Sequence, residues 1–214
     1  MVDVVELIKS RRTVKQFLPK FVDWDKISKV VDAGRHAPSS GNIQNWKFIV
    51  ILEPEIKQKV AQASFEQYDI SIAGALIVVV SEPEKVERYY GLRGERLYSV
   101  QNSAAVAENM LLMAHSLGLG GCWVGAFDED GLSNALGIIE EVRPQAVLTI
   151  GYTDVKPLMP TRYKLENVVF LEKYGNRMKD ADAVMGLHYA KVQRGIGKAK
   201  EVLDKVNKKV FRRE

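Results

Sequence analysis

The segment from Ser99 to Leu117 constrains the fold more than any other, because it predicts a helix with apolar residues on nearly every face. These residues are Val100, Ala104, Ala107, Met110, Leu111, Met113, Ala114 and Leu117. A helix that is apolar all round must be buried. Gly118 and Gly120 are typical of a helix end. We therefore expect this helix at the centre of a domain or at a subunit interface.

The rest of the chain mixes predicted helices and strands without strict alternation. Short apolar runs predict strands over residues 46–52, 75–80, 121–124, 145–151 and 168–171. Periodicity and capping residues predict helices over residues 2–9, 25–36, 55–64 and 128–136. This pattern favours an α+β fold with helices packed on a central sheet. The charged segment 82–97 is interpreted as an exposed excursion, and its sequence leaves open whether it forms a substrate lid.

Length, hydropathy and cysteine content together favour a cytoplasmic protein. The 214 residues suffice for one sizeable core, or for one domain and an appendage. No run of about 18 apolar residues predicts a membrane span. Residues 1–6 are acidic and amphipathic, unlike a signal peptide. Cys122 is the single cysteine, so an intrachain disulfide is impossible.

The positive charge of the chain is concentrated in residues 191–214, which carry nine Lys or Arg and three acids. The whole chain carries +4 and this segment +6, so the other residues carry −2, and nucleic-acid binding is not expected of the body. The segment predicts either a nucleic-acid or membrane-surface helix, or a helix that docks on its own body or on a dimer partner. Its narrow aliphatic stripe favours docking. We expect a domain over residues 1–178 and a basic helical extension over residues 179–214.

An arginine-rich turn follows the first predicted helix. Arg11, Arg12, Thr13 and Lys15 offer three cations and a hydroxyl within five residues. Such a group can surround a phosphate through charge-assisted hydrogen bonds. A solvated basic turn has the same composition, so the motif gains weight only from the motifs that accompany it.

The loop over residues 37–46 is dense in turn formers, amides and hydroxyls. Asn42 and Gln44 can both donate and accept hydrogen bonds, as the pyrimidine edge of a flavin ring requires. The other groups suited to a flat polar ligand are Pro38, Ser39 and Ser40. The alternative is a well-bonded turn before a strand.

The glycine-rich segment over residues 118–127 follows the long helix and leads into a strand. It is therefore not a dinucleotide-binding turn, which follows a strand and opens a helix. Its glycines let the backbone N–H groups of Val124, Gly125 and Ala126 approach a flat ligand. One of these groups could bond to flavin N5, the atom that takes up hydride. The alternative is a helix end followed by a tight turn.

These three motifs, in this order, resemble the nitroreductase family of FMN-dependent oxidoreductases. The matching stretches are residues 11–17, 37–46 and 118–123, within a match that runs from about residue 5 to about residue 172. The resemblance implies a mostly antiparallel sheet flanked by helices. It also implies an intertwined homodimer with the flavin sites at the subunit interface.

The resemblance further implies which residues bind FMN. They are Arg11, Arg12, Thr13, Lys15, Pro38, Ser39, Ser40, Asn42, Gln67, Val124, Gly125, Ala126 and Arg162. The basic turn and Arg162 would hold the phosphate and ribityl chain, residues 38–40 would contact the ring from the opposite subunit, and the others would surround the ring. Two positions depart from the family pattern: Asn45 stands where a proline is usual, and Asn102 where an acid is common. They leave the substrate side open.

The implied activity is hydride transfer from NADH or NADPH to flavin N5, then electron transfer to a nitro, quinone, flavin or similar acceptor by ping-pong exchange. No catalytic side chain and no metal ligand is predicted. Two alternatives stay open. One is a specialised member of the fold that dehalogenates, oxidises a heterocycle or fragments the flavin. The other is a flavin-binding module without turnover, whose tail recruits a partner. The sequence does not decide between NADH and NADPH.

Overall fold

The computed structural model describes residues 3–177. The chain divides into two compact units, Met1–Met159 and Pro160–Glu214, and each is described by itself. The predicted basic extension over residues 179–214 lies outside the described residues. That extension and its boundary after residue 178 therefore stay predictions. Within the described part, no helix is both long enough and apolar enough to cross a membrane.

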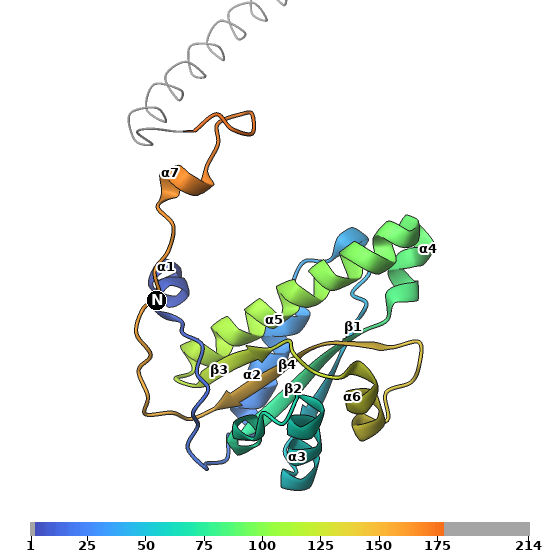
Figure 1. The fold of residues 1–214 in the computed structure, drawn as a ribbon, viewed down its shortest axis with the longest axis vertical. Coiled ribbons are helices and arrows are strands. Elements are labelled where there is room, and N and C mark those ends of the chain that lie inside the picture. Colours follow the sequence, from blue (N-terminus) through green and yellow to red (C-terminus); the bar gives the residue numbers. More distant parts are fainter. Residues whose placement is uncertain (1–2, 178–214) are drawn as a thin grey trace, which may run out of the picture. The chain divides into compact units, whose positions relative to one another are not determined.

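The first unit is built on a four-stranded sheet in the order β1-β2-β4-β3 (Figure 1). The strands are β1 (Trp46–Ile51), β2 (Ala75–Ser81), β3 (Gly120–Val124) and β4 (Arg143–Gly151). Each neighbouring pair is antiparallel. The predicted α+β class is confirmed, as is the antiparallel sheet implied by the family resemblance. The implied homodimer stays a prediction.

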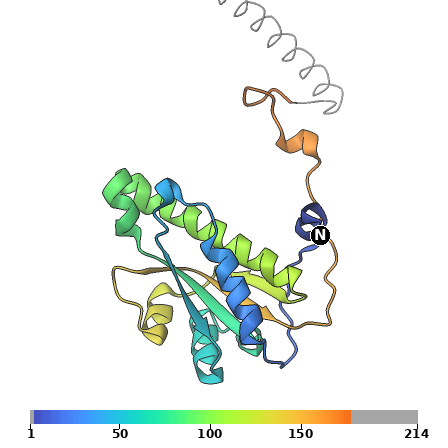
Figure 2. The ribbon, with the colours of Figure 1, turned by 180° about the vertical axis from the view of Figure 1, so that it is seen from behind.

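Helices cover both faces of the sheet (Figures 1 and 2). One face is covered by α2 (Trp24–Arg35) and α5 (Ser99–Ser116), and the other by α3 (Pro54–Ala63) and α6 (Glu129–Leu136). Side chains of β2 alternate between the two cores, because successive residues of a strand point to opposite faces. Ile77 and Val79 pack with α2 and α5, whereas Leu76 and Val78 pack with α3 and α6. All four are fully buried.

Helix α5 is the long apolar helix of the sequence, and it packs on the sheet and on α2. Its side chains Val106, Met110 and Ala114 have no exposed area. A Cβ at Gly34 of α2 would clash with the Met110 side chain, so the glycine allows the two helices to approach closely. Val100 on another face of α5 is 42% exposed. The predicted central position is therefore confirmed, with one face left uncovered in this chain.

Aspartate side chains cap two helices, α1 (Val4–Ser10) and α6. Asp3 accepts a hydrogen bond from the Val5 N–H at 2.8 Å at the start of α1. Asp128 caps α6 as the sequence predicts. Helix α2 begins one residue before the predicted start, after Asp23, and the predicted cap Asp25 pairs instead with Lys29 at 2.7 Å.

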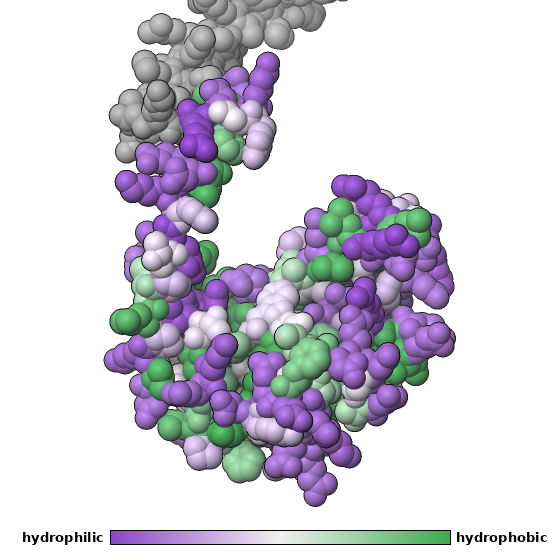
Figure 3. Space-filling view, in the orientation of Figure 1, coloured by the Kyte–Doolittle hydropathy of each residue, from purple (hydrophilic) through white to green (hydrophobic). Residues whose placement is uncertain are grey.

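The segment predicted to be an exposed excursion is helical. It forms α4 (Pro83–Arg93) and a π-helical turn, η3 (Gly94–Tyr98), which runs into α5. Pro83 in the first turn and Glu84 beside it favour the start of a helix. This signal was missed because the charged composition of the segment was weighed instead. Tyr89 and Leu92 are 74% and 58% exposed, and Figure 3 shows hydrophobic groups among hydrophilic ones around α4. Exposure is therefore confirmed, and a lid function stays open.

The second unit contains a short helix, α7 (Leu165–Val168), which ends at the first residue of the strand predicted over residues 168–171, and residues 169–171 form no strand. That prediction is wrong. A strand needs a neighbour for its backbone N–H and C=O groups, and here Phe170 makes a single bridge, to Arg177. The Phe170 ring packs on Tyr174, with the ring centroids 4.8 Å apart.

Candidate functional site

The arginine-rich turn lies against the glycine-rich strand. Thr13 and Gly121 form a parallel bridge, and the Val14 N–H donates to the Gly121 carbonyl at 3.0 Å. A Cβ at Gly120 would come within 3.0 Å of the Val14 side chain, so the glycine permits this close approach. Two of the three predicted motifs, whose paired residues Thr13 and Gly121 are 108 positions apart in the sequence, thus meet at the edge of β3 that faces away from β4.

A cavity of about 420 Å³ lies beside this pairing. Its basic residues are Arg11, Arg12, His115 and Lys156, and its apolar floor includes Val14, Leu111 and Leu119. The Arg11 Nε lies 3.5 Å from a Glu108 carboxylate oxygen. The Arg12 guanidinium donates to the carbonyls of Lys9 and Arg11 at 2.6 and 2.7 Å. Both arginines are thereby oriented, and both border the cavity.

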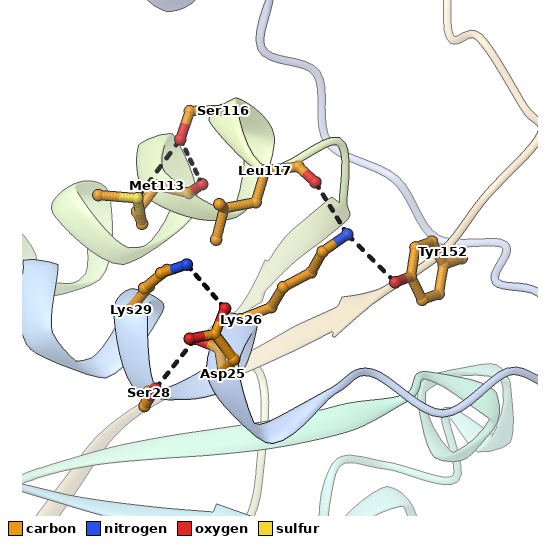
Figure 4. A network of polar contacts seen from close by, with 8 residues as sticks. All are labelled: Asp25, Lys26, Ser28, Lys29, Met113, Ser116, Leu117 and Tyr152. Atoms are coloured by element: carbon orange, nitrogen blue, oxygen red, sulfur yellow. Dashed lines mark hydrogen bonds and ion pairs between the residues drawn. The ribbon is translucent and has the colours of Figure 1, made fainter.

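Lys26 bonds to two residues, Leu117 and Tyr152, that directly precede residues lining this cavity (Figure 4). Its Nζ donates to the Leu117 carbonyl at 3.3 Å and to the Tyr152 hydroxyl at 3.2 Å. It also lies 4.9 Å from the centroid of the Tyr152 ring. One ammonium group therefore joins α2, the C-terminal end of α5 and the residue after β4, next to the glycines that line the cavity.

His115 lies on the wall of the same cavity and stays neutral more readily than an exposed histidine. Its Nε2 is 2.9 Å from the Ser10 hydroxyl. Burial lowers the pKa of His115 from its ordinary value of 6.5, and the positive charges of Arg11 and Arg12 lower this pKa further. His115 is therefore uncharged near neutral pH, and the positive charge on this side of the cavity comes from Arg11 and Arg12.

This lowered pKa predicts that acid destabilises the protein through His115. The unfolded state binds the proton more readily than the folded state, so stability is fully present above pH 6.5 and falls as the pH drops from there towards the folded pKa. Urea unfolding of the wild type and of His115→Gln at about pH 7.5 and about pH 5.5 measures the effect. The wild type should lose more stability than the variant on acidification. Equal losses would assign the acid sensitivity to other groups.

A second cavity, of about 350 Å³, lies on the other side of the bridge. Lys15, Gln67 and Val124 line it, together with Cys122 and Thr149. The Gln67 side-chain N–H₂ donates to the Ser64 carbonyl at 2.7 Å and to the Ala126 carbonyl at 3.3 Å. Four of the predicted cofactor contacts, from three separate segments, therefore meet here: Lys15, Gln67, Val124 and Ala126.

The turn before Gln67 is strained. Phe65 and Glu66 have φ values of 54° and 59°, in the left-handed region that non-glycine residues rarely adopt. Within residues 3–177, the Ser64 hydroxyl is the buried side-chain polar atom without a hydrogen-bond partner. Such features gather at binding sites more often than elsewhere, because strain persists where the surroundings enforce it.

Cys122 is a buried residue of the β3 strand rather than an activated thiol. Burial raises the pKa of its thiol, and the nearby charge of Lys15 only partly offsets this. The thiol therefore stays protonated near neutral pH, as expected for a small core residue.

The loop over residues 38–42 lies at a different corner of the sheet. The loop leads into β1 at Trp46, which pairs with Ser81 of β2, and Ser81 pairs with Arg143 at the start of β4. Gly121, by contrast, pairs with Ile150 near the end of β4. Strand spacing puts the edge strands β1 and β3 about 14 Å apart across the sheet. The end of the sheet at Trp46 and the position of Gly121 are about 20 Å apart along the strands. One chain therefore does not bring this loop to the basic turn.

The loop itself borders a third cavity, of about 410 Å³, with residues of α4. Asn42 and its neighbours line this cavity opposite Lys85, Arg88, Tyr89 and Tyr90. A Cβ at Gly41 would come within 2.6 Å of the Tyr90 hydroxyl, so α4 packs closely on the loop. The Ser39 hydroxyl accepts from the Gln44 N–H at 3.1 Å, and Pro38 is exposed.

Arg162 belongs to the second unit, where its guanidinium donates to the Thr161 carbonyl at 3.3 Å. Its predicted role at the phosphate stays a prediction. Lys156 and His115 at the first cavity were not predicted from the sequence. Lys156 follows β4 in an irregular stretch, and no periodicity or motif marks it. Within residues 3–177, no group of three or more His, Cys, Asp or Glu side chains could hold a metal ion.

Comparison with known proteins identifies the family. The sequence pattern of the Nitroreductase family matches residues 8–152. A provisionally named NADH dehydrogenase/NAD(P)H nitroreductase of Archaeoglobus fulgidus is 31% identical, over 71% of this chain and 86% of the relative. An FMN reductase (NADPH) of Bacillus subtilis is 23% identical, over 75% of this chain and 71% of the relative.

Solved structures share the fold. A nitroreductase family protein from Clostridium difficile 630 superposes with a TM-score of 0.70 at 27% identity, covering 80% of this chain and 99% of that one. The sequence pattern, the relatives and the antiparallel sheet with helices on both faces agree. The chain belongs to the nitroreductase family.

Proposed function

We propose that this protein is an FMN-dependent NAD(P)H oxidoreductase that passes electrons to a nitro, quinone, flavin or similar small acceptor. The observation that carries the proposal is the pairing of Thr13 with Gly121, which sets the cationic turn against the glycine-rich strand. Lys15 and Gln67 then border one cavity with Val124. The names of two relatives, an NAD(P)H nitroreductase and an FMN reductase, support the same chemistry.

The residues present fit FMN. Lys15 supplies positive charge at the cavity that Gln67 and Val124 line, as a phosphate requires. Arg11 and Arg12 supply positive charge at the cavity on the other side of the bridge. Gln67 offers both a donor and an acceptor beside backbone groups of β3. Among the described residues, a Cβ at Gly125 would meet no neighbour closer than 3.5 Å, so packing among them does not require a glycine there. Space kept open at that point suits a flat ligand.

FMN, when bound, would supply the two-electron redox chemistry. The chain would supply binding and orientation. Lys15 and the two arginines would hold the phosphate, Gln67 would orient the ring edge, and backbone N–H groups of residues 124–126 would donate to the ring. Arg162 would add a further cation at the phosphate. These donors favour negative charge on the ligand, which is the charge that reduction adds.

A homodimer would complete the site. The loop over residues 38–42 lies at the corner of the sheet remote from the basic turn, so we propose that it reaches the flavin of the partner subunit. Val4, Val5 and Ile8 on α1 are 63%, 54% and 54% exposed, an apolar face that an intertwined partner would bury. We further propose that the enzyme acts in the cytoplasm and does not bind nucleic acid.

An absorption spectrum of the purified protein, followed by NADH or NADPH under anaerobic conditions, tests the function. We expect flavin bands that bleach on addition of one of the two donors. Bands that persist would instead support a flavin-binding module without turnover. The absence of flavin bands after reconstitution with FMN would contradict the assignment of residues 11–15 and 38–42.

A further inference from the structure

A chain of buried hydrogen bonds joins the loop over residues 38–42 to β1 and α5. Asn45 and Ser99 have no exposed area, and Asn102 is 3% exposed. Asn45 is the last residue before β1, and the other two lie in the first turns of α5. Each buried amide needs partners for both its oxygen and its nitrogen.

The bonds run in sequence from the loop to the helix. The backbone N–H and the hydroxyl of Ser40 both donate to the Asn102 Oδ1, at 3.0 and 3.2 Å. The Asn102 Nδ2 donates to the Asn45 Oδ1 at 2.8 Å. The Asn45 Nδ2 donates to the Ser99 hydroxyl at 2.9 Å. One side-chain oxygen, Asn102 Oδ1, thus receives both donors of Ser40.

The loop held in this way has an unusual backbone. Gly41, Asn42 and Gln44 have φ values of 57°, 58° and 51°. Glycine and asparagine tolerate this left-handed region, but glutamine occupies it only at an energetic cost, so the conformation at Gln44 persists because its surroundings enforce it. Asn102 supplies a fixed acceptor at the start of the strained segment. The Asn42 side chain adds a local bond, from the Gln44 amide at 3.0 Å.

The two positions that depart from the family pattern are therefore in direct contact. Each of the two amides both donates and accepts in this chain of hydrogen bonds. A proline at position 45 has no side-chain donor or acceptor, and a carboxylate at position 102 has no donor. The two departures form a single structural device rather than two separate changes.

We propose that Asn102 and Asn45 are positioning residues, which hold the loop over residues 38–42 in the shape that contacts the flavin. The proposal rests on the proposed function, because it takes this loop as a flavin contact. Asn102 acts on the loop directly through Ser40. Asn45 acts through Asn102, whose amide plane it fixes, and it is itself anchored on Ser99.

The test replaces Asn102 by leucine, which keeps the volume and removes the acceptor. Ser103→Ala is the matched control: Ser103 lies on the same helix, is equally buried at 3%, and donates only to the Ser99 carbonyl of its own helix at 3.0 Å. Asn102→Asp is the conservative variant, because it keeps an acceptor for Ser40. The Asn45 amide can turn to donate to it, and the Ser99 hydroxyl can reverse its role.

Hydrogen exchange of the peptide over residues 38–46 is measured first, in protein freed of flavin. Loss of the acceptor should speed exchange at least about tenfold in Asn102→Leu, and leave Ser103→Ala and Asn102→Asp close to the wild type. FMN affinity, measured by quenching of flavin fluorescence, should fall at least about tenfold in the same variant alone. Asn102→Ala replaces the leucine variant if that variant does not fold.

The outcomes separate this inference from the proposed function. If the wild type binds no FMN, the proposed function fails, whatever the exchange data show. If the wild type binds FMN and Asn102→Leu matches the control in both exchange and affinity, the positioning role is overturned. If Asn102→Asp loses affinity as severely as Asn102→Leu while the loop stays protected, the loop does not act through this acceptor, and the role is again overturned.

Discussion

Replacing Lys15 by methionine is expected to weaken FMN binding by about ten- to a hundredfold. Lys15 borders the cavity that also contains Gln67 and Val124, and it follows the backbone pairing of Thr13 with Gly121. Methionine keeps most of the side-chain length and removes the charge. A hydrogen bond to a charged group contributes about 1.5–3 kcal/mol, which corresponds to this range of affinity. A titration of FMN followed by its fluorescence measures the change.

Lys20→Met is the matched control for this variant. Lys20 lies in the same irregular segment, but its Nζ sits 4.4 Å from the centroid of the Tyr152 ring and borders none of the three cavities described above. Both variants lose one exposed charge, and Lys20→Met also loses its cation–π contact, so Lys15→Met should be at least as stable to heat as Lys20→Met. Equal FMN affinity in both variants would remove Lys15 from the phosphate site and leave the role to the arginines.

The sheet and the helices of the first unit could be predicted because their signals are local. The run over residues 75–80 is apolar at every position and forms the fully buried strand β2. Asp128 caps α6 because a side-chain oxygen is needed there. The same kind of apolar run predicted a strand over residues 168–171, and that prediction was wrong. An apolar run does not show whether a neighbouring strand is present to pair with it, and here Phe170 makes only a single bridge.

The site could be predicted only in part, for a related reason. Resemblance to the family indicated that the turn at Arg11 and the glycines near Gly121 act together, and the structure pairs them. The contact between Asn45 and Asn102 could not be predicted, because the two residues are 57 positions apart and their departures from the family pattern do not indicate that they touch. Lys156 was missed because an isolated lysine after a strand is typical of an exposed surface residue, not of a binding site.

Replacing Gly125 by alanine is expected to reduce FMN affinity about tenfold or more while leaving the fold intact. The backbone at Gly125 is not left-handed, and an added Cβ would meet only the Trp123 ring at an ordinary distance of 3.5 Å. Substitutions free of strain and clash usually change stability by less than about 0.5 kcal/mol. A methyl group placed between this backbone and a flat ligand would instead cost about 1–3 kcal/mol of binding. Thermal unfolding and FMN titration measure the two effects separately.

Gly137→Ala should show the opposite pattern, which makes the pair diagnostic. Gly137 ends α6 with a φ of 65°, and no atom of residues 3–177 lies within 4 Å of an added Cβ. Alanine there costs about 1–2 kcal/mol through backbone strain alone, so the variant should melt earlier and still bind FMN like the wild type. If Gly125→Ala melted early and kept its affinity, the glycine would be serving the fold rather than a ligand. Loss of affinity in Gly125→Ala together with loss of stability in Gly137→Ala would indicate a ligand at Gly125, because no residue within 3–177 needs the space there.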